Sequence, residues 1–549
     1  MNLLEERWIP VRLLDGSRQH IAPHELAGPQ VAAFDAERAD FNGALAQFAI
    51  GLLQTATPVD SDIEWRGLLK SPPGAPTLQA WFSPHTAAFE FDGTGARFMQ
   101  DFELRASDGE ALGIGSLLIE APGVKTVEDN CDHFAKRATV VGLCPFCAAL
   151  ALFTLNVNGP ARGSGHRTGL RGGGPLTTLL VADAGSEDPR SLWQTLWLNV
   201  LPSSEFLSGG GDASKTAAHF TFPWLASIGA TQRQGGQTAP VQVHPAHVFW
   251  AMPLRIRLDL DKGTSGVCDL CARISDQLVA QYVTRKHGLD YAGPWTHPLT
   301  PYSEFDGEMN PVHLRPGGLG YRHWLGWTLG VQSERQRLQR ARSIDYFFDN
   351  AVERKVGISL RLWAFGYDMK SMKARCWYEA VLPLYRLADC NAAAVKAIRE
   401  DVGAWLAGAD QASRYLRDAV KDAWFKKGTA RGKFFFIDAT FWSRTEPIFY
   451  GLLRDRIHAA RDGGEPDAIA PREEWLAKLK STALRVFETE LVGTGPVERM
   501  NPARVAAAHN QLRANLNGPK LRMALALPVE VKPAKVAKGR KEPPAATTP

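Results

Sequence analysis

Long apolar runs are missing from this 549-residue chain. No stretch of about 18 consecutive apolar residues occurs, so we expect no membrane span. The segment Met1–Arg7 lacks the basic start and apolar core of a secretory signal, and we therefore expect a cytoplasmic protein. The number of cysteines is odd, seven, and in a large chain without a secretory signal this argues against a disulfide framework.

Catalytic signatures are also missing. There is no Gly-x-Ser-x-Gly nucleophile elbow and no His-Glu-x-x-His motif. The run Gly209–Thr216 has Ser214 where a phosphate-binding Walker A loop needs glycine. Asp259 and Asp261 are typical of one face of a strand rather than of a metal-binding pair. We therefore expect no enzymatic activity. The alternative is a metal-dependent nuclease or nucleotide hydrolase with a structural zinc, which would need an acidic cluster.

The chain has the composition of a globular protein, with 45% hydrophobic and 22% charged residues. Its formal net charge of +5 permits contact with nucleic acid, but any binding surface has to be a local patch. Residues 1–385 mix short strand-like runs with helices and glycine- or proline-rich turns, whereas residues 386–528 have helical periodicity. The remaining residues, 529–549, are rich in proline, alanine and lysine and are expected to form a disordered basic tail.

Individual elements can be predicted in both parts. Alternation of apolar and polar residues predicts strands at 241–243 and 254–258. Apolar residues three and four positions apart predict four amphipathic helices, over 391–425, 446–461, 472–492 and 502–516. Asn391 is a favourable N-cap for the first of these helices. Several helices with short connections indicate a helical bundle.

Four of the cysteines form two Cys-x-x-Cys pairs, Cys144 with Cys147 and Cys268 with Cys271. Four thiolates suit one tetrahedral Zn²⁺, which has no redox chemistry and serves structural roles. Because 120 residues separate the pairs, a shared zinc would tie together two distant segments. The alternatives are two unrelated buried pairs or a redox motif. The sequence thus predicts an α+β fold: a large mixed N-terminal domain with a split zinc-ribbon-like site, followed by a C-terminal four-helix bundle.

Four basic or glycine-rich segments are candidates for contact with nucleic acid. They are 132–137, with Phe134, Lys136 and Arg137; 160–174, with glycines and arginines; 285–288, with Lys286; and 366–375, with lysines and methionines. An aromatic ring can stack on a base while neighbouring cations hold phosphates, and glycines allow close approach of the main chain. Each segment also has an ordinary interpretation, as a core aromatic, a turn, a surface lysine or a helix N-terminus.

Taken in order, several stretches resemble CasA, the large subunit of the type I-E CRISPR surveillance complex Cascade. They are Asn2–Leu4, Trp8–Val11, Leu143–Phe153, Gly169–Gly173 with Pro175–Thr178, Phe249–Pro253 and Trp295–Pro298. The resemblance runs to about residue 385, and the helical remainder is similar to the family's C-terminal bundle. It implies a non-catalytic subunit with a structural Zn²⁺ held by the four cysteines. Its partners would be CRISPR RNA, the other Cascade subunits, double-stranded target DNA and a helicase–nuclease recruited later.

The resemblance also implies roles for individual residues. Phe134, Lys136 and Arg137 look like the family's segment that contacts the 5′ handle of the CRISPR RNA. A second group is similar to the glycine loop that reads the protospacer-adjacent motif (PAM) from the minor groove: Ala161, Arg162, Gly163, Ser164 and Gly165. Lys286 corresponds to a lysine finger, fifteen residues after the last zinc cysteine. The strand-separating wedge corresponds to Lys370, Ser371 and Met372.

This sequence departs from the family pattern at two of these sites. The glycine loop carries Ala161, Arg162 and Ser164 in place of further glycines. The wedge lacks a glutamine, so Met372 or Lys370 would perform its work. These departures put the PAM preference of this chain in question. The remaining alternative to a DNA-contacting subunit is a zinc-ribbon scaffold, and the absence of salt-sensitive DNA binding would favour it.

Overall fold

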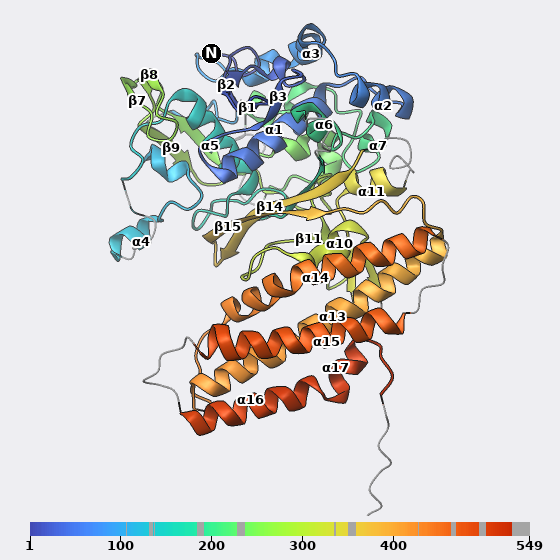
Figure 1. The fold of residues 1–549 in the computed structure, drawn as a ribbon. Helices are drawn as coiled ribbons and strands as arrows, with labels where there is room; N and C mark the ends of the chain where they lie inside the picture. The colour runs from blue at the N-terminus through green and yellow to red at the C-terminus, as the bar shows by residue number, and fades with distance from the viewer. Residues whose placement is uncertain are drawn as a thin grey trace, which may run out of the picture. The chain divides into compact units, whose positions relative to one another are not determined.

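Two compact units make up the chain, one over residues 1–395 and the other from residue 396 onward. The computed structural model (Figure 1) describes residues 1–105, 107–130, 136, 138–183, 191–227, 236–333, 336–349, 358–426, 428–462, 468–493 and 501–529. The predicted basic tail falls outside these residues, apart from Val529. No helix among them is long and apolar enough to cross a membrane.

Small antiparallel sheets, rather than one large sheet, support the first unit. The shorter ones are β2-β1-β3, from β1 (Ile9–Leu13), β2 (Arg18–Ile21) and β3 (Val31–Phe34), and the hairpin of β7 (Thr264–Val267) and β8 (Ile274–Leu278). A third is β4-β9-β6, from β4 (Glu110–Gly113), β6 (Arg255–Leu258) and β9 (Gln281–Arg285). The order β11-β10-β13-β12 joins β10 (Tyr302–Phe305), β11 (Glu308–Pro311), β12 (Val331–Ser333) and β13 (Gln336–Gln339). The last is β15-β14-β5, from β5 (Thr177–Ala182), β14 (Leu360–Lys370) and β15 (Lys373–Pro383).

The core of this unit is built around two helices that are apolar on nearly every side, α1 (Ala39–Ala56) and α5 (Pro145–Asn158). Such helices have to be buried. Phe48 of α1 lies edge-on to Phe153 of α5 and to Trp250, at 5.6 and 5.8 Å between ring centres. The other helices of this unit are α2 (Asp62–Lys70), α3 (Ala75–Phe82), α4 (Val124–Glu128), α6 (Leu192–Trp197), α7 (Ser203–Leu207), α8 (Ala218–Thr221), α10 (Trp324–Thr328) and α11 (Arg342–Asp349).

One predicted strand is confirmed and the other is wrong. β6 lies within the predicted residues 254–258. Residues 241–243 instead belong to a 3₁₀ turn, Pro240–Gln242. Proline fixes the helical φ at the first position of this turn, and the Gln242 side chain accepts a hydrogen bond from Ala239 N at 2.8 Å. This local capping decides between turn and strand over so short a stretch.

The secondary-structure elements among the described residues of the second unit are all helices. Its helices are α13 (Ala392–Trp424), α14 (Phe435–Arg461), α15 (Ile469–Arg485), α16 (Pro502–Leu516) and α17 (Pro519–Ala524). All four predicted helices are confirmed, and Asn391 Oδ1 caps α13 by accepting from Ala394 N at 2.8 Å. α14 begins eleven residues before the predicted start, and a π-helical turn, Val486–Leu491, follows α15.

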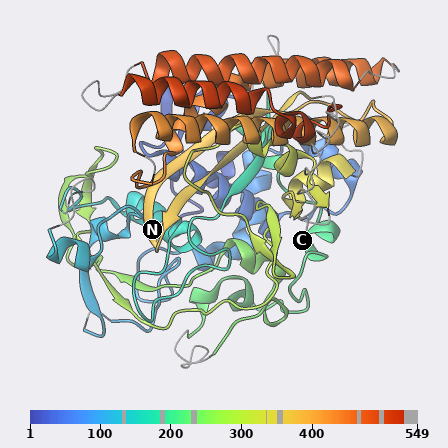
Figure 2. The same cartoon turned by 90° about the horizontal axis from the view of Figure 1, so that it is seen from below.

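The long helices α13 to α16 run side by side (Figures 1 and 2). Trp475 on α15 is fully buried and donates its indole N–H to Trp405 O on α13 at 2.9 Å. Asp401 on α13, 3% exposed, accepts from Arg456 on α14 at 2.7 Å and from Arg472 on α15 at 2.8 Å. One buried carboxylate therefore binds three of the helices together.

A four-cysteine centre and a candidate nucleic-acid interface

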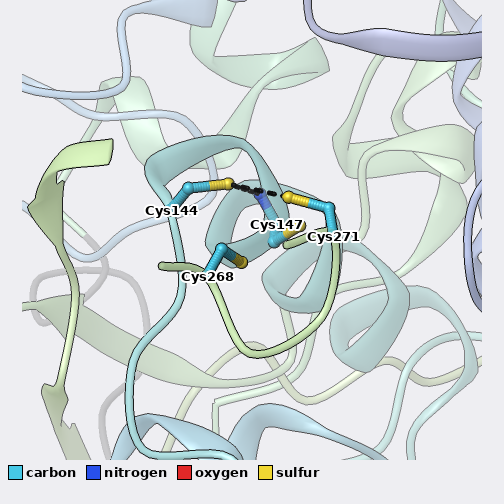
Figure 3. A group of neighbouring side chains, drawn as sticks. All are labelled: Cys144, Cys147, Cys268 and Cys271. Carbon is cyan, nitrogen blue, oxygen red and sulfur yellow. Dashed lines mark hydrogen bonds between the residues drawn. The ribbon is translucent and has the colours of Figure 1, made fainter. Parts of the chain in front are cut away.

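The two Cys-x-x-Cys pairs meet, as the sequence predicted (Figure 3). The sulfur atoms of Cys144, Cys147, Cys268 and Cys271 all lie within 4.8 Å of one another. Cys144 Sγ and Cys271 Sγ are 3.7 Å apart, whereas a tetrahedron with Zn–S bonds of about 2.3 Å has edges of about 3.8 Å. All four thiols are free rather than joined in disulfides. The donor set, the spacing and the partial burial of the group fit a structural zinc ion.

Each pair is set by a local backbone feature. Cys144 is the N-cap of α5, and its sulfur accepts from Cys147 N at 3.5 Å, so that both sulfurs lie at the start of the helix. Cys268 and Cys271 lie in the turn between β7 and β8. This turn closes through Cys268 N to Arg273 O at 2.9 Å, and Ala272 takes the left-handed conformation with φ of 56°.

Backbone and carboxylate contacts hold the two turns together independently of the sulfurs. Leu143 and Val279 form an antiparallel bridge with hydrogen bonds of 3.0 and 2.7 Å. Asp269 Oδ2 accepts from Val141 N at 2.7 Å and from Gly142 N at 2.8 Å. Sequence reasoning missed Asp269, although its place between the two cysteines of the second pair was a usable signal.

Crowding of the sulfurs makes the four thiols inequivalent. The hydrogen bond with Cys144 raises the pKa of the Cys147 thiol well above its ordinary value. The hydrogen bond with Cys144 lowers the pKa of Cys271 to about 7. Four thiolates in this space repel one another unless a cation lies between them, and a divalent ion supplies that charge.

The structure brings the glycine loop and Lys286 into contact. His287 N donates to Gly165 O at 2.9 Å, and a Cβ atom on Gly165 would lie only 2.9 Å from Lys286 Cδ. Gly163 and Gly165 have φ of 105° and 86°, which favours glycine at both positions. Gly163, Ser164 and Lys286 are exposed, and Ala161 is half-buried. Two segments far apart in the sequence thus present main chain and one cation on the same surface.

Two arginines of the glycine-rich stretch, Arg162 and Arg171, donate to groups inside the protein. Arg162 donates to Ser116 O and, at 2.8 Å, to Leu118 O, and burial lowers the pKa of its guanidinium. Arg171 is 3% exposed and donates to Gln47 Oε1 at 2.5 Å. These hydrogen bonds engage the two guanidinium groups within the protein, and a role of Arg162 in binding DNA stays a prediction. They anchor the loop because its own glycines offer no side chains for packing.

The predicted wedge is the tip of the β14–β15 hairpin and not a helix N-terminus. Lys370 pairs with Lys373, and between them Ser371 and Met372 have φ of 50° and 61°. Positive φ at both positions defines a type I′ turn, whose twist matches that of the flanking strands. All four residues are exposed, Met372 by 56%. On β14, Tyr367 donates to Asp40 Oδ2 at 2.6 Å and so fixes the hairpin to α1.

A second glycine run connects the loop to this hairpin. Gly174 N donates to Asn158 O at 2.9 Å, just before the glycine loop. A Cβ on Gly173 would lie 2.9 Å from Pro160 Cα, and one on Gly174 would lie 2.6 Å from Tyr367 O. Only glycine allows both approaches. The glycine loop, Lys286 and the hairpin tip therefore belong to one connected group of elements, which we call the loop–hairpin surface.

The expected RNA-contacting segment can be placed only in part. Lys136 is exposed, whereas Phe134 and Arg137 lie outside the described residues. On the N-terminal side of this segment, Thr126 in α4 accepts a hydrogen bond from Lys373 Nζ at 3.2 Å. The segment that leads to Lys136 thus begins close to the tip of the β14–β15 hairpin.

Comparison with known proteins decides the family. The family of CRISPR-associated protein Cse1 matches residues 2–486. The chain belongs to the Cse1 family. A Cse1 structure from Thermobifida fusca has a TM-score of 0.66 at 14% identity and covers 96% of this chain and 98% of its own. The CasA (Cse1) structure from Thermus thermophilus has a TM-score of 0.64 at 16% identity, covering 95% and 99%.

A third similar chain comes from a structure described as a CRISPR RNA-guided surveillance complex. Its TM-score is 0.64 at 16% identity, and the match covers 94% of this Cse1-family chain and 99% of that chain. At these identities the structural likeness establishes the fold. The predicted membership of the CasA family is confirmed, because CasA and Cse1 are names of the same relative.

Proposed function

We propose that this chain is the non-catalytic large subunit of a type I-E Cascade complex. It recognises the PAM in double-stranded DNA, starts strand separation for R-loop formation and helps to recruit the helicase–nuclease. Family membership and the shared fold with a chain of a CRISPR RNA-guided surveillance complex support the assembly role. The contact between Gly165 and Lys286 carries the DNA-binding role, because it joins accessible main chain to an exposed cation.

The chemistry of such a surface suits a short and relaxed reading of DNA. Minor-groove edges distinguish mainly A·T from G·C pairs, and a glycine strip can approach them closely. A guide RNA supplies the long sequence specificity by base pairing, so the protein has to read only a brief duplex element. We assign the main chain of residues 161–165 and the Lys286 ammonium to this reading, and the Arg162 side chain to anchoring the loop.

The hairpin tip is the proposed wedge. An apolar side chain inserted at a base step partly unstacks it, at a free energy of a few kcal/mol. Met372 is exposed at the end of a stiff two-stranded element, with Lys370 and Lys373 beside it to contact phosphates. Ser371 completes the turn. Strand opening would begin here, next to the strip that reads the PAM.

The remaining assignments concern RNA, metal and the helical part. Lys136, with Phe134 and Arg137, is proposed to contact the handle of the CRISPR RNA. A Zn²⁺ ion on the four cysteines would fix the turn from which β8 and β9 lead to Lys286.

The C-terminal helices, residues 386–528, are proposed to form a four-helix bundle domain that supports the displaced strand. Among the described residues no acidic cluster could hold a metal, which a nuclease would need.

The deciding experiment is PAM-library binding by the reconstituted complex, with and without this subunit. We expect PAM-dependent enrichment only in its presence, and no duplex cleavage by the subunit with Mg²⁺ or Mn²⁺. Equal enrichment without the subunit would refute the proposed reading of the PAM. Cleavage would favour the nuclease alternative.

Lys286→Ala should weaken binding of PAM-bearing duplex by about 1–3 kcal/mol, the usual range for a base contact. The reason is that an exposed ammonium next to the glycine strip is removed while the backbone of the loop remains. The measurement is the Kd of the reconstituted complex for duplexes with and without a PAM. Lys70→Ala, another exposed lysine, is the charge-matched control. Equal losses for both variants would contradict the assignment.

Met372→Gly should leave the fold and the initial duplex affinity intact, because glycine accepts the φ of 61° without strain. Strand opening can be followed with a fluorescent base analogue next to the PAM and should slow at least about tenfold. The reason is that the wedge offsets the free energy of unstacking a base step, a few kcal/mol. Met523→Ala removes a methionine of similar exposure, 58%, and serves as the control. Unchanged opening in Met372→Gly would place the wedge elsewhere.

A further inference from the structure

A cavity of about 450 Å³ lies against the β4-β9-β6 sheet, outside the loop–hairpin surface. Arg97, Arg105, Arg257 and Lys262 line it, together with Asp259 and Asp261. Lys262 is paired with Asp259 at 2.9 Å, so these two charges offset each other. Counting Asp261 against the three arginines leaves an excess of positive charge. We call this cavity the Arg97–Arg257 pocket.

Two guanidinium groups in the pocket lack the partners that arginines in such positions normally have. The buried Nη1 of the Arg257 side chain has no hydrogen-bond partner among the described residues. Arg97 is only 7% exposed, and within the described part of the chain it donates solely through Nε, to Gly93 O at 2.8 Å. Buried polar groups are nearly always satisfied, so an unsatisfied donor indicates an ion or water that completes the site.

The electrostatics of the pocket favour the binding of an anion. Burial, followed by the nearby charge of Arg97, lowers the pKa of Arg257 to about 10. Burial also lowers the pKa of Arg97. Asp261 acts on both groups through space only, without a hydrogen bond. The neighbouring Asp101 forms an ion pair with Arg255 at 2.5 Å. Two cations that repel each other in a cavity are stabilised by an anion that accepts hydrogen bonds from both.

The strand register joins this pocket to the proposed DNA contact. Arg257 on β6 lies opposite Val283 on β9, and Arg255 lies opposite Arg285. Since alternate residues share a face, Arg255, Arg257 and Arg285 lie on one face of the sheet. β9 then leads directly into Lys286. Lys286 is three positions after Val283, or about 10 Å along the strand direction. The phosphates of one DNA strand advance by about 3.4 Å each along the helix axis, so the pocket and Lys286 lie within reach of one short stretch of duplex.

We propose that the Arg97–Arg257 pocket binds a backbone phosphate of the nucleic acid whose bases Lys286 contacts. This inference rests on the proposed function and adds a site to it. Arginine suits the role because its planar fork of donors matches phosphate oxygens. A phosphate contact positions the duplex without reading its sequence. The pocket would therefore set the register of the duplex on the loop–hairpin surface.

The test compares Arg257→Gln and Arg105→Gln with Arg337→Gln, a surface arginine on β13 that is 49% exposed. The complex reconstituted with each full-length variant is titrated with fluorescent duplex at several salt concentrations. We expect Arg257→Gln to bind several-fold more weakly, equally with and without a PAM, and to reduce the slope of log K against log salt by about 0.9. Arg337→Gln should match the wild type. Because Arg97 and Arg257 repel each other, Arg257→Gln should not lower the midpoint of thermal unfolding.

The outcomes separate the pocket from the proposed function. Wild-type affinity and slope in both pocket variants would overturn the pocket, while a loss in Lys286→Ala would still uphold PAM reading. Absence of duplex binding by the wild-type complex would overturn both. Titration of the protein with inorganic pyrophosphate forms a second arm. Pyrophosphate binding that Arg257→Gln abolishes, with duplex binding unaffected, would assign the pocket to a free phosphate compound and overturn the nucleic-acid assignment.

Discussion

Replacing Cys268 with serine should weaken zinc binding more than about a hundredfold. Loss of a group that only hydrogen-bonds to a metal ligand typically lowers metal affinity about 10–100-fold, and loss of the ligand itself should lower it more. Serine removes one of four sulfurs, and its hydroxyl is a poor ligand for zinc at neutral pH. The remaining three sulfurs lie within 4.8 Å of one another and would keep only a weak site. The measurements are zinc content per chain and affinity in competition with a chelator.

The zinc experiment has an internal control and a structural readout. Cys376 is free and exposed on β15, so Cys376→Ser should retain the full metal content. Loss of zinc should speed amide exchange in β7 and β8, whose turn carries two ligands, while Leu143 and Val279 stay partly protected by their own hydrogen bonds. Equal zinc content in both variants would contradict the proposed ion, as would wild-type protein that carries no zinc.

Asp401→Ala should destabilise the helical unit by about 3–5 kcal/mol, because it leaves buried cations without their carboxylate. The Arg456 side chain is 3% exposed and that of Arg472 13%, and both donate to Asp401. The Arg456 guanidinium therefore loses its buried carboxylate partner, whereas Arg472 keeps a hydrogen bond to Ala526 O at 3.2 Å. Amide exchange within α13, α14 and α15 reports this directly, and the expected acceleration is about a hundredfold to a few thousandfold.

The same helix supplies the control for Asp401→Ala. Asp410 on α13 is 57% exposed and pairs with Arg414 four residues later. Such exposed helical pairs contribute about 0.3–0.5 kcal/mol, so Asp410→Ala should barely change the exchange rates. Exchange in the first unit should stay the same in both variants. If Asp401→Ala behaved like Asp410→Ala, the buried carboxylate would not be what holds these helices.

Local signals in the sequence were sufficient wherever one residue type dictates one geometry. Paired cysteines predicted the four-sulfur centre, Asn391 marked the start of α13, and the glycine-rich stretch predicted a turn, in which Gly163 and Gly165 have positive φ. Each depends on contacts that the residue makes almost irrespective of its surroundings. These parts of the fold and of the site therefore followed from the chain alone.

Long-range pairing was beyond the reach of the same reasoning. The residues around Ser371 and Met372 are compatible with the start of a helix, because lysines and methionines favour helices. In the structure β14 pairs with both β15 and β5, and this pairing makes the segment a strand. Arg162 and Arg171 look like surface charges until tertiary structure places carbonyl and amide oxygens around them. The Arg97–Arg257 pocket depends on the register of three strands and carries no sequence signal of its own.

The distance between the two cysteine pairs has a consequence for biosynthesis. Cys144 is translated 127 residues before Cys271, so at about 5–20 residues per second a ribosome needs roughly 6–25 s between them. During that interval the nascent chain offers only half of a coordination sphere. The early pair is then open to capture by oxidants or by other thiols. Completing the mature centre has to wait until the later turn has emerged and folded against the start of α5.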